Sequence, residues 1–527
     1  MDISLDPREG SAAFKARPWS ASGYRGLFAV LAFGFAIRLY LSLSNYCISG
    51  DGVAYLGMAR AFAARDWQAA FGSVFSPLYP GLIALAHRVI PDWELAGNFV
   101  SLLTGSGAIA TVYLMTREAF ARSDLALGAA GLTAIHPELA GYSASVRTEA
   151  GYILLMTAST WLLLKGTREQ RLRVVAIAGA VGGFAYLYRT EGVGLLLFVI
   201  MFVPVAASMW QRELFGRAIM AASAFAVAFV IIAAPYPVIV HATTGHWAVS
   251  REFTAAMMNG MGRASTNGEV WWRLEFSANV SPLAPLLTDP KLYIEKIAGD
   301  FVRSFYGFEQ ALGPILTALL AVGLWARRDK IFVSFAETFI ALLVVFFFCG
   351  FAFARTGARL MVHLIPFTFG WVMLGFEICS DALARAASTH GWHLPQSALA
   401  IIIAFILLPR TLWPIGYDMR GIREAGKAIA RRAPKPAAVA ARDGRVAYYA
   451  GARFFLLPTE PTGNLCSWLE KRSEVGYVLA DDHDELRLGA STLHCLGFLK
   501  RYHRYGTHYY DLYIVRAPRR DVPTSGK

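Results

Sequence analysis

Long apolar runs, separated by short basic or polar links, constrain this chain more than any other feature of its sequence. The runs are about 17–24 residues long, the length that an α-helix needs to cross the hydrocarbon core of a bilayer. The hydrophobic share of the chain is 56%, above the roughly 45–50% of ordinary soluble domains. We therefore expect about eleven membrane-spanning helices. The expected spans are residues 27–44, 95–116, 124–139, 149–165, 173–188, 193–210, 217–240, 310–326, 332–353, 360–380 and 396–414.

Lys and Arg residues gather in alternate links between these runs. Because such residues are retained on the cytoplasmic side of a membrane, the basic tail 1–26 predicts an N-terminus inside and a C-terminus outside. The formal net charge of +13 is then explained mainly by topology. No basic helix or aromatic binding motif supports nucleic acid, so we expect no nucleic-acid partner. The links assigned to the inside contain Arg117 and Arg122, Lys165–Arg173, Arg212 and Arg217, Arg327, Arg328 and Lys330, and Arg385.

The intermediate segment 76–90 is short, has two prolines near its start and contains His87 and Arg88. Such a segment is more typical of an interfacial or re-entrant helix than of a span. If it crossed the membrane, every later basic link would face outward, against the charge rule. We therefore predict that it does not cross. The regions predicted to lie on the periplasmic (extracytoplasmic) side of a cell inner (plasma) membrane are 45–94, 241–309 and 416–527.

The tail after the last run has a different composition. Residues 416–527 mix Gly, Pro and charged residues with short apolar runs at 476–480 and 509–515, which are typical of strands. Helices are predicted at 421–432 and 463–472. The predicted fold class is thus mainly α: a polytopic membrane helix bundle over residues 27–415, followed by a small soluble α/β domain.

Two of the five cysteines, Cys466 and Cys495, fall in the tail domain. On the outer side of a membrane a disulfide between them would persist. The alternative is a pair of buried free thiols. Because no C-x-x-C pair occurs, a zinc or thioredoxin-like site is not expected.

Charged residues cluster at the outer ends of several predicted spans, where they are costly and usually serve a purpose. Each has a simpler explanation: a turn at Asp51 between Gly50 and Gly52, local ion pairs in the Arg-Thr-Glu sequences, or arginines anchored to lipid headgroups. Their joint occurrence on one side instead favours a pocket for an anionic lipid head. The candidates are Asp51, His136, Glu138, Arg147, Glu149, Arg189, Glu191, Arg355 and Arg359.

With these residues the sequence resembles the GT-C superfamily of membrane glycosyltransferases, and in particular the branch of the protein O-mannosyltransferases and the lipid A aminoarabinose transferase. The features that carry the resemblance run through the whole chain. They are Asp51 after the first span with Tyr55 behind it, the helix expected at Ala59–Arg65, the segment Phe75–Gly81, the links SVRTEA, YRTEG and RTGARLMVHLIP, and the soluble outer tail. Close relatives often carry two adjacent acids where this chain has Asp51 followed by Gly52, which leaves the subfamily and the substrate open.

The resemblance implies a polyprenyl-phosphate-linked sugar as donor, transferred with inversion to a hydroxyl of a glycan, lipid or protein acceptor. Asp51 is then expected to be the general base. Arg359, Arg355, Arg189 and Arg147 would stabilise the leaving phosphate, and Glu149 and Glu191 would orient the arginines or bind a sugar hydroxyl. Tyr55, His136 and Glu138 are expected to support the site.

Two further expectations concern the surroundings of Asp51. Its flanking glycines would let the backbone approach a ligand closely, and the segment 76–90 would cover the site. A divalent metal held by Asp51 and Glu149 is an alternative that the sequence leaves open, and no other cofactor is expected.

Two other functions compete with a transferase. The first is a transporter or flippase of lipid-linked sugars, although paired repeats and broken helices typical of transporters are not evident. The second is a non-catalytic membrane assembly protein with the tail as its binding module. Only the transferase accounts for an acidic residue beside a cluster of arginines.

Overall fold

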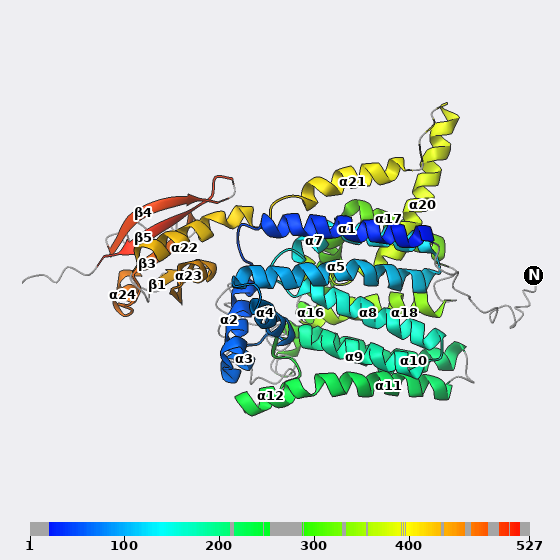
Figure 1. Cartoon of the computed structure of the whole chain (residues 1–527), viewed down its shortest axis with the longest axis horizontal. Coiled ribbons are helices and arrows are strands. Elements are labelled where there is room, and N and C mark those ends of the chain that lie inside the picture. The colour runs from blue at the N-terminus through cyan, green and yellow to red at the C-terminus, as the bar shows by residue number, and fades with distance from the viewer. Residues whose placement is uncertain are drawn as a thin grey trace, which may run out of the picture.

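The computed structural model describes residues 21–516, apart from 211–214, 246, 253–286, 288, 329–333, 355–356, 392, 394, 396, 434–436, 459–464, 483–494 and 505. Long helices lie side by side and form the body of the molecule, and a small sheet domain extends from one end of it (Figure 1). The long helices are α1 (Ala21–Leu43), α5 (Trp93–Phe120), α8 (Glu149–Arg168), α9 (Leu172–Tyr188), α10 (Val193–Trp210), α11 (Phe215–Ala233), α18 (Phe335–Ala354) and α20 (Ile365–Thr389).

In the part of the chain that the structure describes, five helices are long and apolar enough to cross a membrane. These candidate spans are Arg25–Leu43, Trp93–Phe120, Phe215–Thr244, Phe335–Phe353 and Ile365–Thr389. A sixth span is formed if α16 (Pro290–Leu312) and α17 (Pro314–Arg327), which meet at 106°, are taken together. The chain is therefore a multi-pass membrane protein, while the count of about eleven spans stays a prediction.

Shorter apolar helices stand where most of the other spans were predicted. They are α6 (Ser123–Ile135), α9, α10 and α21 (Ala398–Thr411). The predicted outer loop 241–309 differs from expectation, because α12 (Pro235–Thr244) and α16 form helices at its two ends.

Small residues allow some of the helices to pack with their backbones in contact. A Cβ atom at Gly179 of α9 would overlap the carbonyl oxygen of Phe225 in α11. Cβ atoms at Gly323 of α17 and Gly375 of α20 would overlap carbonyl oxygens of the opposite helix in the same way. Such close approach is the usual basis of helix association in a bilayer.

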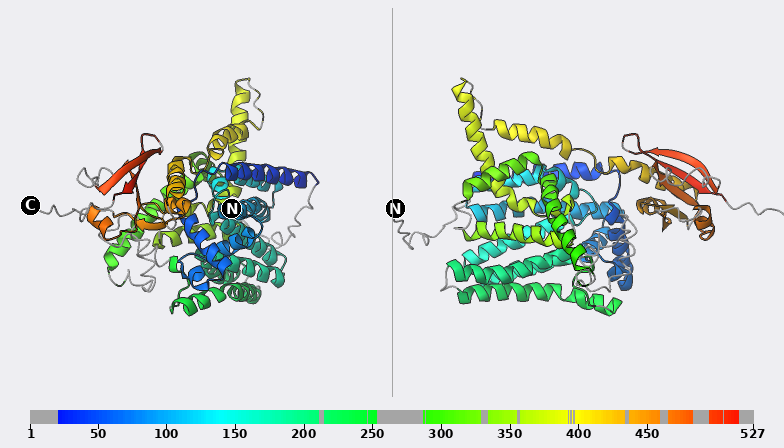
Figure 2. Two further views of the ribbon diagram at one scale, coloured as in Figure 1. Left: turned by 60° about the vertical axis from the view of Figure 1, so that its left-hand side comes forward. Right: turned by 180° about the vertical axis from the view of Figure 1, so that it is seen from behind.

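Three short helices lie across one end of the bundle, next to the sheet domain (Figures 1 and 2). They are α2 (Gly50–Ala64), α3 (Trp67–Gly72) and α4 (Leu78–His87). With ten residues, α4 is about 15 Å long, half of the roughly 30 Å hydrocarbon core. This length agrees with a segment 76–90 that does not cross, but the topology itself remains a prediction.

Two arginines of the predicted basic links pair with acidic side chains of neighbouring helices. Arg122 forms an ion pair with Glu377 at 2.8 Å, and Arg168 forms one with Glu118 at 3.0 Å. The side of the membrane on which these links lie stays a prediction.

The C-terminal part contains a five-stranded sheet in the order β2-β1-β3-β5-β4. The strands β1 (Ala438–Ala441), β2 (Arg453–Leu456) and β3 (Tyr477–Asp481) are parallel, and β4 (Leu496–His503) and β5 (Tyr509–Val515) join in antiparallel pairs. Both faces of the sheet are covered by apolar cores. The helices of this part are α22 (Arg420–Arg432), α23 (Arg445–Ala450) and α24 (Leu465–Glu470).

The predicted elements of the tail are found, since α22, α24, β3 and β5 coincide with the segments expected from the sequence. The disulfide between Cys466 and Cys495 is also confirmed, with a Cα–Cα distance of 5.7 Å. The bond joins Cys466 of α24 to Cys495, which directly precedes β4.

Candidate active site

Asp51 lies in the first turn of helix α2, and not in an irregular loop. The hydroxyl of Ser49 caps this helix by accepting a hydrogen bond from the N–H of Gly52 at 3.0 Å. The same hydroxyl donates to the carbonyl oxygen of Val146 at 2.7 Å. These two bonds fix the start of α2 against the link between α7 (Pro137–Tyr142) and α8.

Gly52 is required where the start of α2 meets the link between α7 and α8. A Cβ atom there would lie 2.8 Å from the side chains of Ile48 and Ser49 and 3.1 Å from the carbonyl oxygen of Val146. The expectation that the glycines serve the approach of a ligand therefore needs correction, because Gly52 makes room for the protein's own backbone. A second acid at position 52 would not fit without a shift of this link.

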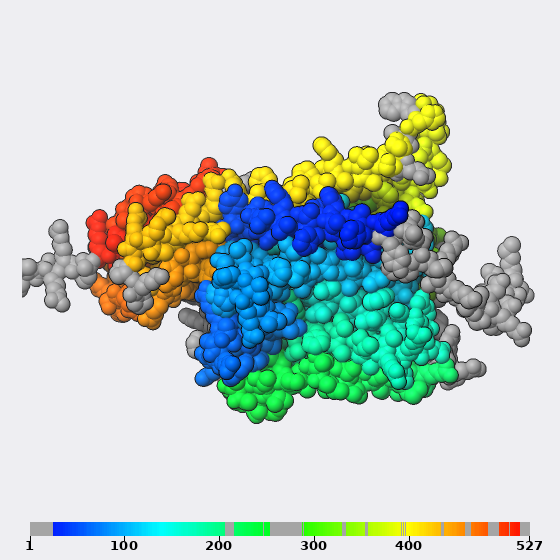
Figure 3. Space-filling model, in the orientation of Figure 1, coloured from blue at the N-terminus to red at the C-terminus, as the bar shows by residue number. Residues whose placement is uncertain are grey.

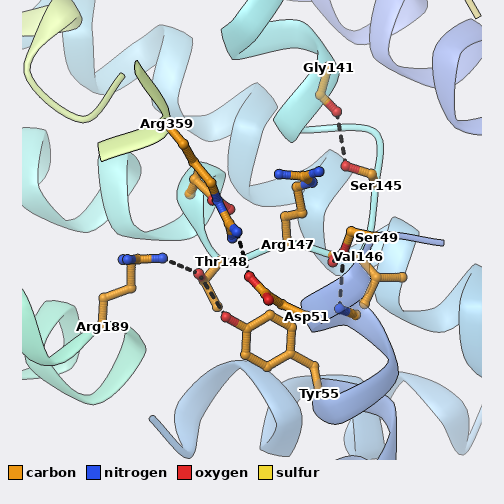
Figure 4. A network of polar contacts seen from close by, with 12 residues as sticks. Ser49, Asp51, Tyr55, Gly141, Ser145, Val146, Arg147, Thr148, Arg189 and Arg359 are labelled. Atoms are coloured by element: carbon orange, nitrogen blue, oxygen red, sulfur yellow. Dashed lines mark hydrogen bonds and ion pairs between the residues drawn. The ribbon is translucent and has the colours of Figure 1, made fainter. Parts of the chain in front are cut away.

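Arg359 connects two carboxylates that come from different helices, and Figure 4 shows its contact with one of them, Asp51. Its Nη1 donates to Oδ2 of Asp51 at 2.5 Å, and its Nε donates to Oε1 of Glu149. Arg359 belongs to the short helix α19 (Ala358–Met361). Helix α16 packs on this segment at Gly307, where a Cβ atom would lie 3.1 Å from the backbone of Gly357.

The two carboxylates differ in accessibility. The side chain of Asp51 is 34% exposed and that of Arg359 is 37% exposed, whereas that of Glu149 is fully buried. Glu149 occupies the first turn of α8, where the helix dipole favours a negative charge. A ligand can therefore reach Asp51 and Arg359, while Glu149 holds Arg359 from behind.

Burial disfavours the charged form of Arg359, but the charges of Glu149 and Asp51 outweigh this effect and raise its pKa well above the ordinary value. The guanidinium stays positively charged. Its Nη2 group takes part in neither of the two ion pairs.

A second charged group lies around Arg189, which is 5% exposed and precedes the 3-10 turn η2 (Thr190–Gly192). Arg189 contacts Glu191 at 2.6 Å and donates to the hydroxyl of Thr148 at 2.9 Å. The hydroxyl of Tyr55 from α2 contacts the same Thr148 oxygen at 3.4 Å. Tyr55 and Arg189 thus converge on Thr148, the neighbour of Glu149 (Figure 4).

Glu252 completes this second group, and the sequence analysis missed it. Its carboxylate lies 3.9 Å from Nη2 of Arg189. Burial, followed by the repulsion of Glu191, raises the pKa of Glu252 to about 7, although Arg189 acts in the opposite direction. No motif marks Glu252 in the sequence, since it lies in the long predicted loop 241–309 without an acidic or basic partner at helical spacing.

The remaining predicted residues lie in different places. Arg147 lies beside Asp51 and Arg359 (Figure 4), with its guanidinium 4.9 Å from the ring of Tyr142. Arg355 lies outside the described residues.

The other two predicted supporting residues make different contacts. The carboxylate of Glu138 pairs with Arg410 of α21 at 2.9 Å, and a ring nitrogen of buried His136 contacts the carbonyl oxygen of Leu312 at 3.3 Å. These contacts connect helices, and the expectation that the two residues support the site stays a prediction.

The alternative of a divalent metal between Asp51 and Glu149 does not fit this arrangement. Among the described residues, no group of three or more His, Cys, Asp or Glu side chains could hold a metal ion. The guanidinium of Arg359 occupies the place between the two carboxylates.

Comparisons with known proteins agree with this fold. The chain is similar to the archaeal oligosaccharyltransferase AglB from Archaeoglobus fulgidus, solved with an inhibitory peptide and a dolichol-phosphate; the TM-score is 0.59 and the identity 14%, over 96% of this chain and 76% of that one. It is also similar to ArnT from Cupriavidus metallidurans bound to undecaprenyl phosphate, with a TM-score of 0.56 and 13% identity, over 95% of this chain and 100% of that one. No curated protein sequence matches the chain.

These likenesses define the class: the chain has the fold of the GT-C membrane glycosyltransferases, as its sequence led us to expect. Within that class, residues 75–239 match the model of a family described as dolichyl-phosphate-mannose-protein mannosyltransferase. The matched segment contains Arg147, Glu149, Arg189 and Glu191.

Proposed function

We propose that this protein transfers a sugar from a polyprenyl-phosphate donor to a hydroxyl of a glycan, lipid or protein acceptor at the outer face of the membrane. The observation that carries the proposal is the contact of Arg359 with both Asp51 and Glu149. It places a solvent-accessible carboxylate next to a cation that another, buried carboxylate holds in position. A general base beside an anion-binding group is what this reaction requires.

The neighbours in fold support the choice of donor. AglB was solved with a dolichol-phosphate and ArnT with undecaprenyl phosphate. In this chain, Arg359, Arg189 and Arg147 lie around Asp51 and Thr148 (Figure 4), and planar guanidinium groups are well suited to phosphate oxygens. The phosphate of the donor would bind at Arg359 and the neighbouring arginines.

The reaction follows from these positions. Asp51 accepts the proton of the acceptor hydroxyl as its oxygen forms a bond to the anomeric carbon of the sugar. The bond from that carbon to the phosphate oxygen breaks, and the phosphate leaves with the electron pair. Because the oxygen attacks from the face opposite the leaving group, the configuration at the anomeric carbon is inverted. The negative charge that grows on the phosphate is balanced by Arg359, whose ion pairs already fix its orientation.

The competing transporter needs an arginine pocket as well, but it has no use for a base. In transporters, substrate sites generally lie near the middle of the membrane, whereas Asp51 belongs to α2, which lies at one end of the bundle (Figure 1). The non-catalytic assembly protein leaves the Asp51–Arg359 pair without a purpose.

The experiment is a transfer assay with purified protein. It measures the release of polyprenyl phosphate from a panel of labelled lipid-linked sugars in the presence of hydroxyl-bearing acceptors. We expect release that depends on the protein and on Asp51. Movement of the intact lipid-linked sugar across vesicles, with no release from any donor, would instead support the transporter.

A further inference from the structure

The segment 45–49, which links α1 to α2, is held by the C-terminal domain. Nη1 of Arg423 in α22 donates to the carbonyl oxygens of Asn45 and Tyr46, both at 3.2 Å. The N–H of Tyr46 donates to the carbonyl oxygen of Ile415 at 2.8 Å. Figure 3 shows the yellow and orange surface of the C-terminal part against the blue surface of α1 and α2.

The linker that leads into the C-terminal domain also approaches segment 45–49 closely. Gly416 has a φ of +66°, and a Cβ atom there would lie 3.0 Å from the backbone N and O of Cys47. A glycine is therefore needed both for the conformation and for the close approach.

Among these contacts with segment 45–49, the hydroxyl of Tyr449 in α23 binds the residue nearest to Asp51 in the sequence, Ile48. It accepts a hydrogen bond from the N–H of Ile48 at 2.7 Å and donates to the carboxylate of Glu94 at 3.3 Å. Its ring lies 5.2 Å from the guanidinium of Arg423. One hydroxyl thus joins the C-terminal domain, the segment before α2 and the start of α5.

A short path leads from this hydroxyl to Asp51. Ile48 is followed by Ser49, the residue that caps α2 through Gly52 and also binds Val146. Asp51 stands in the first turn of the capped helix. A shift at Ile48 therefore changes the cap and the direction in which the carboxylate of Asp51 points.

We propose that Tyr449 is a positioning residue, through which the C-terminal domain holds Asp51 in the geometry needed for catalysis. The inference rests on the proposed function, in which Asp51 is the general base. Tyr449 itself does not touch the substrate. Reacting groups that are misplaced by about 1 Å can lose as much as about 100-fold in rate, so a single hydroxyl at this place is expected to matter.

The test compares Tyr449→Phe with Tyr448→Phe in the purified full-length protein. Both changes remove one hydroxyl from α23, but Tyr448 contacts Arg60 through its ring, at 5.4 Å. Hydrogen exchange measured by mass spectrometry reports on the backbone of residues 45–56, and transfer kinetics give kcat and the KM for the donor.

We expect faster exchange at 45–56 in Tyr449→Phe, a kcat lowered by about 10- to 100-fold and a donor KM within about twofold of the original. Tyr448→Phe should match the original protein in all three. Unchanged exchange and unchanged kcat in a folded Tyr449→Phe protein would overturn the proposal, and so would a rise in KM alone.

If Tyr449→Phe does not yield folded protein, Arg423→Gln decides the question with the same measurements. The exchange experiment needs no substrate, so it also separates the two hypotheses. If the original protein transfers no sugar, the proposed function fails, whereas exchange at 45–56 still shows whether Tyr449 holds this segment.

Discussion

Asp51 and Arg359 are 308 residues apart in the sequence, yet Oδ2 of Asp51 and Nη1 of Arg359 are 2.5 Å apart. The contact joins the first turn of α2, which follows the first long helix, to α19, which lies late in the bundle. Such a pair forms only when the intervening helices are packed. The Asp51–Arg359 ion pair therefore depends on the packing of the bundle as well as forming part of the candidate active site.

Asp51→Asn should abolish most of the transfer. The amide nearly keeps the size of the side chain but cannot accept a proton, so turnover should fall by at least about 100-fold. Donor binding should survive, because Arg359 keeps its contact with Glu149. Transfer and binding are measured on the purified variant, with Asp66→Asn, at the N-cap of α3, as the control. A folded Asp51→Asn protein with normal turnover would exclude Asp51 as the base.

Arg359→Lys should weaken donor binding by about 10-fold or more, since a hydrogen bond to a charged group contributes about 1.5–3 kcal/mol. The lysine retains a positive charge opposite the buried Glu149 but lacks the planar fork that binds two partners. Arg410→Lys, which changes an exposed ion pair with Glu138, is the control. Binding is measured with a labelled donor after thermal unfolding has shown that both variants are folded. Equal affinity in all three proteins would reduce Arg359 to a structural role.

Arg359→Ala should impair the protein more than Arg359→Lys, because it should also lower the stability of the fold. It leaves the fully buried carboxylate of Glu149 without its hydrogen-bonded cation. Removing one partner of a fully buried pair costs about 3–5 kcal/mol, and the loss here should be smaller, because Arg359 is 37% exposed and Arg147 and Arg189 also act on Glu149. Thermal unfolding should show a clear loss of stability for Arg359→Ala. If the alanine variant unfolds at the same temperature as the original protein, Glu149 does not depend on Arg359.

Glu252 predicts a dependence of stability on pH. Its pKa is raised to about 7 by burial and by Glu191, so the folded state binds a proton that the unfolded state, with a pKa of about 4.3, has lost. Stability is therefore expected to fall as the pH rises from about 4.5 to 7, by up to about 4 kcal/mol, and to level off above that. Glu252→Gln should remove this fall.

The measurement is thermal unfolding between pH 5 and 8.5, and Glu295→Gln, on the exposed side of α16, is the control. Parallel curves for the original protein and for Glu252→Gln would show that Glu252 is ionised in the fold throughout this range.

Loss of the disulfide should destabilise the C-terminal domain. The bond closes a loop of 29 residues, which in the chain-entropy model contributes about 3–4 kcal/mol. The Cys466→Ser and Cys495→Ser double variant should unfold at a lower temperature, whereas Cys379→Ser, at a free cysteine of α20, should not. Mass spectrometry without reductant should detect the bond in the original protein; free thiols at both positions would refute it.

The topology predicts opposite sides for the two ends of the bundle. Reporter fusions after Glu169, which lies beside Arg168 and Arg171, should be cytoplasmic, and fusions at the C-terminus should be extracytoplasmic. Two fusions on the same side would contradict the arrangement.

The sequence was informative where one physical signal dominated. Apolar length predicted the helices of the bundle, and a short apolar run predicted β5 at 509–515. It failed for β1, because Ala438–Ala441 has little strand propensity and is a strand only through its buried neighbours β2 and β3.

The start of α2, in the candidate active site, also depends on contacts that are distant in the sequence. Gly50 and Gly52 disfavour a helix, so a turn at Asp51 remained an alternative in the sequence and a helix was expected only from Ala59. The cap by Ser49 and the contact with Val146, which no local pattern shows, extend the helix back to Gly50.

Arg38 was missed for a similar reason: it lies within an apolar run, fully buried, and donates to carbonyl oxygens of Thr133 and Ala134.

The contact between segment 45–49 and the C-terminal domain also has a consequence for biosynthesis. A chain is synthesised from its N-terminus, so the segment before Asp51 enters the membrane early, while Arg423 and Tyr449, which bind it, are made near the end. A nascent or prematurely terminated chain would contain Asp51 and the arginines but not the part that fixes their geometry. Competence for the reaction would then arise only after the ribosome has completed the protein.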